Sequence, residues 1–165
     1  MLQMREIFMN QPKIISTGIR DLQCGDNVRI VQPCNIYSCT LGEDVFVGPY
    51  VEIQKGVKIG DRTRIQSHSF ICELVTIGMD CVIAHGVMFT NDLFRIGGPA
   101  RGNQELWKST LIGNNVSIGS NATILPVKIC EHVVIGAGSV VTKSIQEPGI
   151  YAGNPACKIR EIEIK

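Results

Sequence analysis

The sequence predicts an all-β fold, a parallel β-helix in which very short strands wind into one solenoid. Three observations support this: an apolar residue at every sixth position, a small residue directly after it, and a small or β-branched residue four positions on. A period of six is neither the 3.6-residue period of an α-helix nor the simple alternation of a strand. The apolar positions form one unbroken series: Leu41, Val47, Ile53, Ile59, Ile65, Ile71, Ile77, Ile83 and Phe89.

Each six-residue unit is predicted to be a short strand followed by a bend. In the unit 59–64, Ile59 and Thr63 are four apart and therefore face the same side of an extended chain. Gly60 and Asp61 are expected to carry the turn, because Gly, Asn and Asp tolerate unusual backbone angles. Three units then close a triangular coil of eighteen residues, and coils stacked about 4.8 Å apart enclose a column of Ile and Val.

The period divides a single domain of 165 residues into parts. Residues 1–23 lie outside the period and are predicted to be an N-terminal arm or cap. Residues 24–145 form the β-helix, interrupted by a loop at 93–110 that holds paired Gly, a Pro and the only Trp. Residues 146–165 are predicted to be a short tail that caps the open end of the helix.

Composition excludes several classes of protein. The net charge of +1 gives no reason to expect binding of nucleic acid or of an anionic membrane. No apolar run is long enough for a membrane span, and the first ten residues lack the apolar core of a signal peptide. The seven cysteines contain no CxxC pair, so we interpret them as reduced packing residues of a cytoplasmic protein, with no metal site expected.

Two polar residues eighteen apart meet at the root of the predicted loop. Glu73 and Asn91 are both third residues of their units, so they should stack on one corner. Lys55 lies one coil below, and Asp92 follows Asn91. Turn chemistry and a weak surface ion pair are the alternative explanation. Because long excursions in compact folds are more often functional than tolerated insertions, we expect a ligand or subunit contact here.

His85 is also a third residue, but on the neighbouring corner. A histidine is the natural general base near neutral pH, and a packed or exposed corner histidine is the alternative. The chain has only two others, His68 at a fourth position and His132 several coils away. A metal-dependent hydratase of the carbonic-anhydrase type needs three converging histidines, and it is therefore only a minor hypothesis.

The sequence resembles the hexapeptide-repeat acyltransferases, and within them the nucleotide-linked 3-amino-sugar N-acetyltransferases of surface-polysaccharide (lipopolysaccharide) biosynthesis. This resemblance implies a left-handed β-helix, a homotrimer with active sites between neighbouring subunits, and acetyl-CoA lying along the coil. It leaves the nucleotide open, UDP or dTDP. Six segments carry it: IQSHSFICELVTIG (65–78), HGVMFTND (85–92), GGPARGN (97–103), SIGSNATILP (117–126), VVIGAGSVVTK (133–143) and YAGNPA (151–156).

The resemblance also implies roles for single residues. Glu73, Asn91 and Asp92 match the amino-sugar contacts, with Asn91 and Asp92 as the main catalytic pair. In this branch the departing CoA sulfur can take the proton, whereas in other hexapeptide transferases, including sugar O-acetyltransferases, a histidine such as His85 is the base. A common family variant carries a basic residue where this chain has Cys157. The residues that match the contacts with CoA are Ser120, Ala137, Thr142, Lys143, Gly153, Asn154, Pro155 and Arg160.

Overall fold

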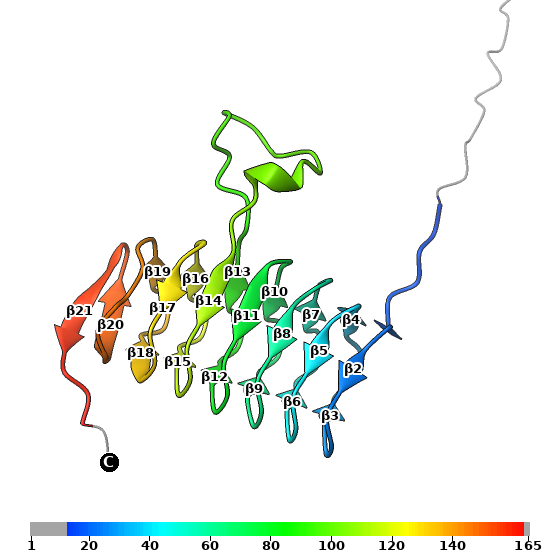
Figure 1. Cartoon of the computed structure of the whole chain (residues 1–165), viewed down its shortest axis with the longest axis horizontal. Coiled ribbons are helices and arrows are strands. Elements are labelled where there is room, and N and C mark those ends of the chain that lie inside the picture. Colours follow the sequence, from blue (N-terminus) through cyan, green and yellow to red (C-terminus); the bar gives the residue numbers. More distant parts are fainter. Residues whose placement is uncertain (1–12, 164–165) are drawn as a thin grey trace, which may run out of the picture.

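The chain forms a triangular solenoid of about seven turns whose walls are parallel β-sheets, except for the last strand of one wall, which is antiparallel (Figure 1). The computed structural model describes residues 13–163. Within this range the regular structure consists of strands of two to five residues and one short 3₁₀ helix, η1 (Gln104–Leu106). The architecture confirms the predicted fold, a left-handed parallel β-helix with one protruding loop.

Three faces, named A, B and C, form the walls of the solenoid. Face A contains β1 (Ile19–Arg20), β4 (Asn35–Tyr37), β7 (Glu52–Ile53), β10 (Phe70–Ile71), β13 (Met88–Phe89), β16 (Thr123–Ile124) and β19 (Val140–Val141). Face B contains β2 (Gln23–Cys24), β5 (Thr40–Leu41), β8 (Lys58–Ile59), β11 (Val75–Ile77), β14 (Thr110–Ile112) and β17 (Lys128–Ile129). Face C contains β3 (Arg29–Ile30), β6 (Phe46–Val47), β9 (Arg64–Ile65), β12 (Val82–Ile83), β15 (Ser117–Ile118), β18 (Val133–Ile135), β20 (Gly149–Gly153) and β21 (Ala156–Arg160).

Residues eighteen apart stack directly in the coils just before the loop, as the sequence predicts, whereas the first coils and those beyond the loop stack at a spacing of seventeen. On face B, Ile77 pairs with Ile59 on one side. On its other side Ile77 pairs with Ile112, because the loop lies between these two strands in the sequence. The vertical spacing across the loop is therefore 35 residues, as in the bond from the Met79 backbone N–H to Asn114 Oδ1. The loop is an insertion into one coil, and the ladders continue beyond it in register.

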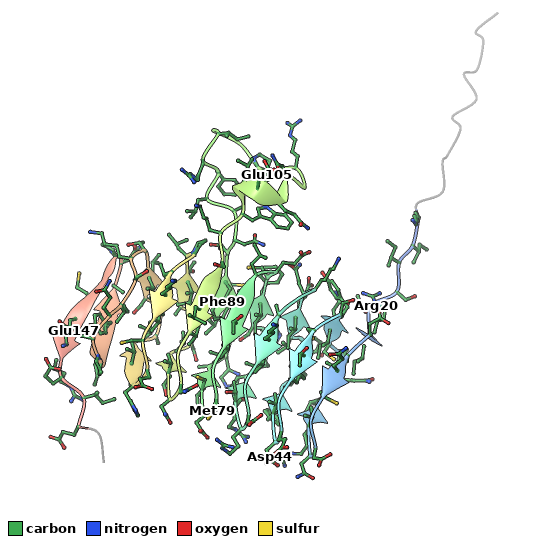
Figure 2. The ribbon with its side chains drawn as sticks, viewed as in Figure 1. Arg20, Asp44, Met79, Phe89, Glu105 and Glu147 are labelled. Carbon is green, nitrogen blue, oxygen red and sulfur yellow. The ribbon has the colours of Figure 1, made fainter. Side chains whose placement is uncertain are left out.

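The interior is filled by the first and fifth residues of the units. Phe89 is fully buried and has the largest side chain in the core, at the foot of the loop (Figure 2). Thr63 and Ser69 are also buried, and their hydroxyls donate to the backbone carbonyls of Gly78 and Ala84. Their polar groups are thus satisfied inside an otherwise apolar column.

The bend lies later in each unit than the sequence predicts. The expected turn residues of the unit 59–64 are Gly60 and Asp61, but the positive φ falls on the fourth residue, Arg62 (φ 57°). Gly60 is needed for another reason, because a Cβ there would lie 2.6 Å from backbone atoms of the next coil. Small second residues therefore let successive coils approach, while the fourth position makes the turn.

The solenoid extends further at both ends than the period indicates. β1 pairs with β4 and β2 pairs with β5, so part of the predicted arm 1–23 already belongs to the ladders. Residues 1–12 of that arm lie outside the described residues. In the predicted tail 146–165, β20 adds a parallel strand to face C and β21 turns back along it. End coils have solvent on one side, as the 40% exposure of Ile19 illustrates, so they need not keep the apolar period.

Candidate functional site

The protruding loop rises from one edge of the prism (Figures 1 and 2). We call the corner between faces A and B edge AB, and the loop there spans 90–109, since Thr110 of the predicted loop 93–110 belongs to β14. Edge AB consists of residues 21–22, 38–39, 54–57, 72–74, 90–109, 125–127 and 142–144. The corner between faces C and A, edge CA, consists of residues 31–34, 48–51, 66–69, 84–87, 119–122 and 136–139.

Asn91 lies directly above Glu73 on edge AB, as the eighteen-residue spacing predicts. The Asn91 Nδ2 donates a hydrogen bond of 3.3 Å to the backbone oxygen of Glu73, and both residues are half-buried. The backbone N–H of Glu73 in turn donates to Oε1 of Gln54 at 3.3 Å. Because Asn91 is held through its nitrogen, its Oδ1 is left as an acceptor. Among the ion pairs of residues 13–163, none joins Lys55 to Glu73.

Negative charge gathers around Glu73. Burial raises the pKa of Tyr37, and the carboxylates of Glu52 and Glu73 raise it further. Glu52 Oε1 accepts a hydrogen bond of 2.9 Å from Nε2 of Gln54. Next to Glu73, burial raises the pKa of the Cys72 thiol to about 12, so this thiol stays protonated. The sequence analysis did not select Gln54 or Glu52, although Gln54 lies 19 residues, about one coil, before Glu73 and could have been identified by that spacing.

Asp92 holds the loop with both oxygens of its carboxylate. Its Oδ1 accepts the backbone N–H of Phe94 at 2.8 Å, and its Oδ2 accepts the backbone N–H of Ala100 at 2.7 Å. Asp92 also forms an antiparallel bridge with Trp107, and the backbone oxygen of Asn91 accepts the N–H of Lys108 at 2.9 Å. The role predicted for Asp92 in catalysis stays a prediction, while its contacts within the chain tie the two legs of the loop together.

His85 lies on edge CA, as predicted, and pairs with a serine one coil below. Its Nδ1 is 2.8 Å from Oγ of Ser67. The imidazole is exposed. In the neutral ring, a hydroxyl of Ser67 that donates to Nδ1 leaves the proton on Nε2, and a hydroxyl that accepts from Nδ1–H leaves Nε2 unprotonated. Face A separates this pair from Asn91, because β13 runs between the two edges. Within one chain the structure therefore groups Glu73, Asn91 and Asp92, and it leaves His85 apart.

The residues matched to CoA contacts divide between the same two edges. Ser120 follows His85 along edge CA, and its backbone oxygen accepts the N–H of Gly138. Ala137 and Gly153 join this edge, since Ala137 stacks on Gly119 and the Gly153 N–H donates to Ser139 Oγ at 3.1 Å. Asn154 and Pro155 form the adjoining turn between β20 and β21. Thr142 and Lys143 lie instead on edge AB, and both are exposed.

The C-terminal hairpin places its cations differently. Arg160 is exposed at the end of β21, opposite Ile150. The Lys158 Nζ lies 2.8 Å from Glu161 Oε1 and 3.4 Å from Glu147 Oε2. Glu161 and then Glu147 raise the pKa of Lys158. Lys158 is therefore engaged by carboxylates and does not replace the basic residue that is missing at Cys157.

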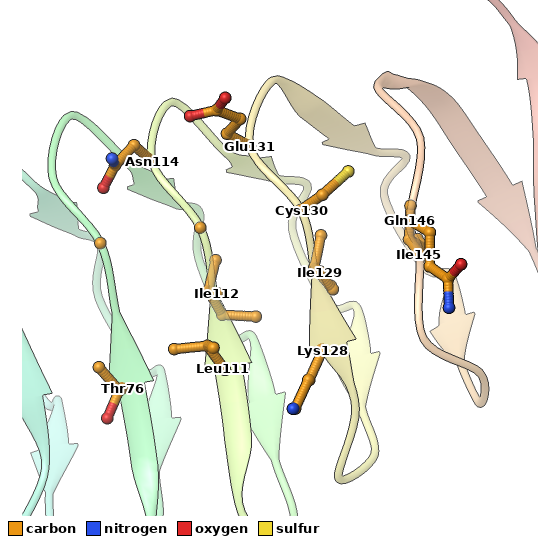
Figure 3. Close-up of a pocket in the computed structure, with 12 residues that line it drawn as sticks. Thr76, Leu111, Ile112, Asn114, Lys128, Ile129, Cys130, Glu131, Ile145 and Gln146 are labelled. Atoms are coloured by element: carbon orange, nitrogen blue, oxygen red, sulfur yellow. The ribbon is translucent and has the colours of Figure 1, made fainter.

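A hollow on face B contains none of the predicted site residues. It measures about 580 Å³ and spreads over β11, β14 and β17 (Figure 3). The exposed Leu111 and Lys128 border it, with the backbone of the buried core strands as its floor. Being broad and shallow, with few convergent polar groups, this hollow lacks the features of a catalytic pocket.

Two further expectations concern metals and membranes. Among residues 13–163, no three His, Cys, Asp or Glu side chains are close enough to hold a metal ion. His68 and His85 lie on edge CA, whereas His132 lies on the third edge, between faces B and C. No helix in this part of the chain has the length and apolar character to cross a membrane.

Family models and a curated relative match the chain. The bacterial transferase hexapeptide (six repeats) model covers residues 38–73, and the hexapeptide repeat of succinyl-transferase covers 110–143. Galactoside O-acetyltransferase from Escherichia coli (strain K12) is 38% identical over 129 residues, which are 74% of this chain and 64% of the relative. The chain thus spans less than two thirds of that relative, and 33% of the bifunctional protein GlmU from Streptococcus uberis.

Solved structures share the architecture. AntD, an N-acyltransferase from Bacillus cereus in complex with dTDP and coenzyme A, superposes with a TM-score of 0.71 over 86% of this chain and 84% of that chain. At 24% identity this likeness shows the fold alone. The hexapeptide-repeat acetyltransferase VCA0836 from Vibrio cholerae, complexed with acetyl-CoA, is 26% identical with a TM-score of 0.62, over 75% of this chain and 71% of that chain. The repeats, the fold and these matches together show that the chain is similar to the hexapeptide-repeat acyltransferases.

Proposed function

We propose that the protein transfers the acetyl group of acetyl-CoA to the amino group of a nucleotide-linked 3-amino deoxysugar, UDP- or dTDP-linked, in surface-polysaccharide biosynthesis. The observation that carries this proposal is the stacking of Asn91 on Glu73 at the root of the loop. It presents a carboxylate and an amide oxygen, which are acceptors suited to an amine. Acetyl transfer itself is supported by the 38% identity to a galactoside O-acetyltransferase and by the likeness to acetyl-CoA-bound VCA0836.

The proposed reaction forms a bond between the amine nitrogen and the thioester carbonyl carbon and breaks the bond between that carbon and sulfur. Glu73 and the Oδ1 of Asn91 accept hydrogen bonds from the amine and point its lone pair at the carbonyl. The departing thiolate takes the proton that the nitrogen loses. Asp92 is then a positioning residue that acts through the loop, since its two oxygens are engaged by loop amides.

Acetyl-CoA is proposed to lie along the C-terminal coils. Ser120, Ala137 and the turn 153–155 are neighbours on edge CA, whereas Lys143 lies on edge AB. A homotrimer in which edge CA of one copy faces edge AB of the next would bring these two groups together, as it would His85 and Asn91. Light scattering should give three times the 18.1 kDa chain mass, and a monomeric mass for the active enzyme contradicts this arrangement.

The test of the activity is thiol release from acetyl-CoA in the presence of UDP- and dTDP-linked 3-amino sugars. Asn91→Ala should lower kcat by about a hundredfold, or about 3 kcal/mol of transition-state stabilisation. Asn115→Gly is the matched control, because Asn115 is an exposed corner residue with a φ of 55° on the third edge. An absence of turnover across the whole panel of amino sugars would refute the proposal.

A second candidate is O-acetyl transfer to a sugar hydroxyl, which the Ser67–His85 pair favours. A hydroxyl must lose its proton during attack, and an imidazole held at Nδ1 by Ser67 is suited to remove it. His85→Ala should then abolish transfer to hydroxyl acceptors. If N-acetylation uses no side-chain base, the same variant keeps nearly the wild-type rate with an amino sugar, and this contrast separates the two functions.

The proposed location is the cytoplasm. All seven cysteines lie within residues 13–163, and none is part of a disulfide there. Persistent free thiols are typical of reducing compartments. Fractionation of cells that produce the full chain should recover it with cytoplasmic markers, and recovery with the envelope fraction would contradict the proposal.

A further inference from the structure

A stacked pair of aromatic rings stands on edge CA near the N-terminal end of the solenoid. The rings of Tyr50 and His68 lie one coil apart, with centroids 4.9 Å apart and an interplanar angle of 25°. Both side chains are exposed, and Tyr50 has 60% of its surface open to solvent. Both are fourth residues of their units and have the positive φ of the turn, 59° and 63°. No step of the proposed reaction uses either ring.

Beside Tyr50 lies a hollow of about 220 Å³, distinct from the one on face B. Pro33 and Tyr50 border it from edge CA, and Asn35 and Glu52 border it from face A. The Asn35 Oδ1 accepts a hydrogen bond of 3.4 Å from Arg20, so its Nδ2 is left as a donor. Ring surface, an amide donor and a carboxylate acceptor thus surround one small space.

This hollow is connected to the candidate reaction site by polar side chains of the same chain. Glu52, which lines the hollow, accepts a hydrogen bond from Gln54, and Gln54 accepts the backbone N–H of Glu73. From Tyr50 to Gln54 the chain crosses face A through β7, and four residues span at most about 13 Å of extended backbone. A ligand that reaches from Tyr50 to Glu73 must therefore be long, with a planar group at one end and the reacting group at the other.

Arg20 supplies a cation beside the hollow, on its N-terminal side. Its guanidinium lies 5.3 Å from the centre of the Tyr37 ring and donates to Asn35 and to the backbone oxygen of Ser16, on the side of the hollow away from Glu73. A guanidinium is well suited to a diphosphate. The hollow and this cation thus offer a site for a planar base and for the diphosphate attached to it.

We infer that the hollow at Tyr50 binds the pyrimidine base of the nucleotide-linked sugar, with the base stacked on the Tyr50 ring. This inference rests on the proposed function. Uracil and thymine present an N3–H donor flanked by carbonyl acceptors, which complements the carboxylate of Glu52 and the Nδ2 of Asn35. The adenine of CoA offers the same stacking chemistry, but the residues matched to CoA lie toward the opposite end of the solenoid.

The test measures binding of UDP, dTDP, CDP and CoA to the full chain by calorimetry, without acetyl transfer. Tyr50→Asn removes the ring and keeps a residue that tolerates a positive φ. It should weaken UDP and dTDP binding by about ten- to a hundredfold, the usual effect of losing one stacked aromatic. The matched control Tyr50→Phe keeps the ring and should bind like the wild type. CDP should bind more weakly than UDP, and the Kd of CoA should not change.

Several outcomes would overturn the inference. The first is that the wild type binds neither UDP nor dTDP at millimolar concentration. The second is that Tyr50→Asn binds both nucleotides with the wild-type Kd. The third is that Tyr50→Asn loses affinity only for CoA. A thermal melt of Tyr50→Asn checks its folding, and saturation-transfer NMR on the wild type reports contact with the base protons independently of any variant. Nucleotide binding that needs Tyr50 without turnover of any amino sugar would refute the proposed function and leave the base site standing. Turnover of an amino sugar by Tyr50→Asn with an unchanged KM would refute the base site and leave the proposed function intact.

Discussion

Removal of the Asp92 carboxylate should release the loop 90–109 while the solenoid stays folded. Asp92 makes two hydrogen bonds, at 2.8 Å to the Phe94 N–H and at 2.7 Å to the Ala100 N–H. Bonds to a charged group contribute about 1.5–3 kcal/mol each. The bond to Phe94 is exposed and that to Ala100 is partly buried, so we take the lower end and expect Asp92→Ala to cost about 3 kcal/mol.

This cost should appear as local opening, because the loop is an insertion and the ladders on either side continue in register. A loss of about 3 kcal/mol corresponds to a roughly hundredfold faster exchange of the Ala100 amide. Hydrogen exchange followed by mass spectrometry or NMR measures it directly. Asp92→Asn keeps one acceptor oxygen, so it should show an intermediate effect. Asn91→Ala is the control, and it should leave the Ala100 amide protected.

The result that refutes this reasoning is unchanged protection of the Ala100 amide in Asp92→Ala. A second informative result is a large loss of kcat in Asp92→Asn with the loop still protected. That combination would place the carboxylate of Asp92 at the reacting atoms, as the family resemblance implies, and not in a positioning role.

The other predictions concern the solenoid itself. Gly60→Ala should lower the free energy of unfolding by about 1–3 kcal/mol, because the added Cβ would lie 2.6 Å from backbone atoms of the next coil. Urea denaturation measures this change, and a variant as stable as the wild type contradicts the close packing of the coils. In native protein at pH 8, Cys157 should react with a thiol reagent and Cys72 should not, since burial raises the Cys72 pKa to about 12; equal rates contradict this. Arg62 holds the pKa of Asp80 below its usual value. The pair therefore stabilises the fold above about pH 4, and this stabilisation is lost as the pH falls through the lowered pKa. In Arg62→Ala, NMR titration should show a higher pKa for Asp80, and an unchanged pKa contradicts this.

Sequence periodicity was sufficient to predict which residues are neighbours along the solenoid axis. The stacking of Asn91 on Glu73 follows from their separation by one coil, and the observed bond confirms that neighbourhood. The period was less informative about the backbone. It could not separate the residue that bends, Arg62, from the residue that must be small, Gly60, because both requirements recur once in every unit.

The sequence by itself determined the fold, the position of the one interruption and the residues that meet at its root, because a strict repeat converts sequence separation into height along the axis. Only the tertiary structure decided how side chains meet across a face or within the loop. It showed that both oxygens of Asp92 are bound by loop amides, that the Nδ1 of His85 pairs with Ser67, and that Tyr50 stacks on His68. These arrangements depend on rotamers and on the path of an aperiodic segment, and a repeat carries no information about either.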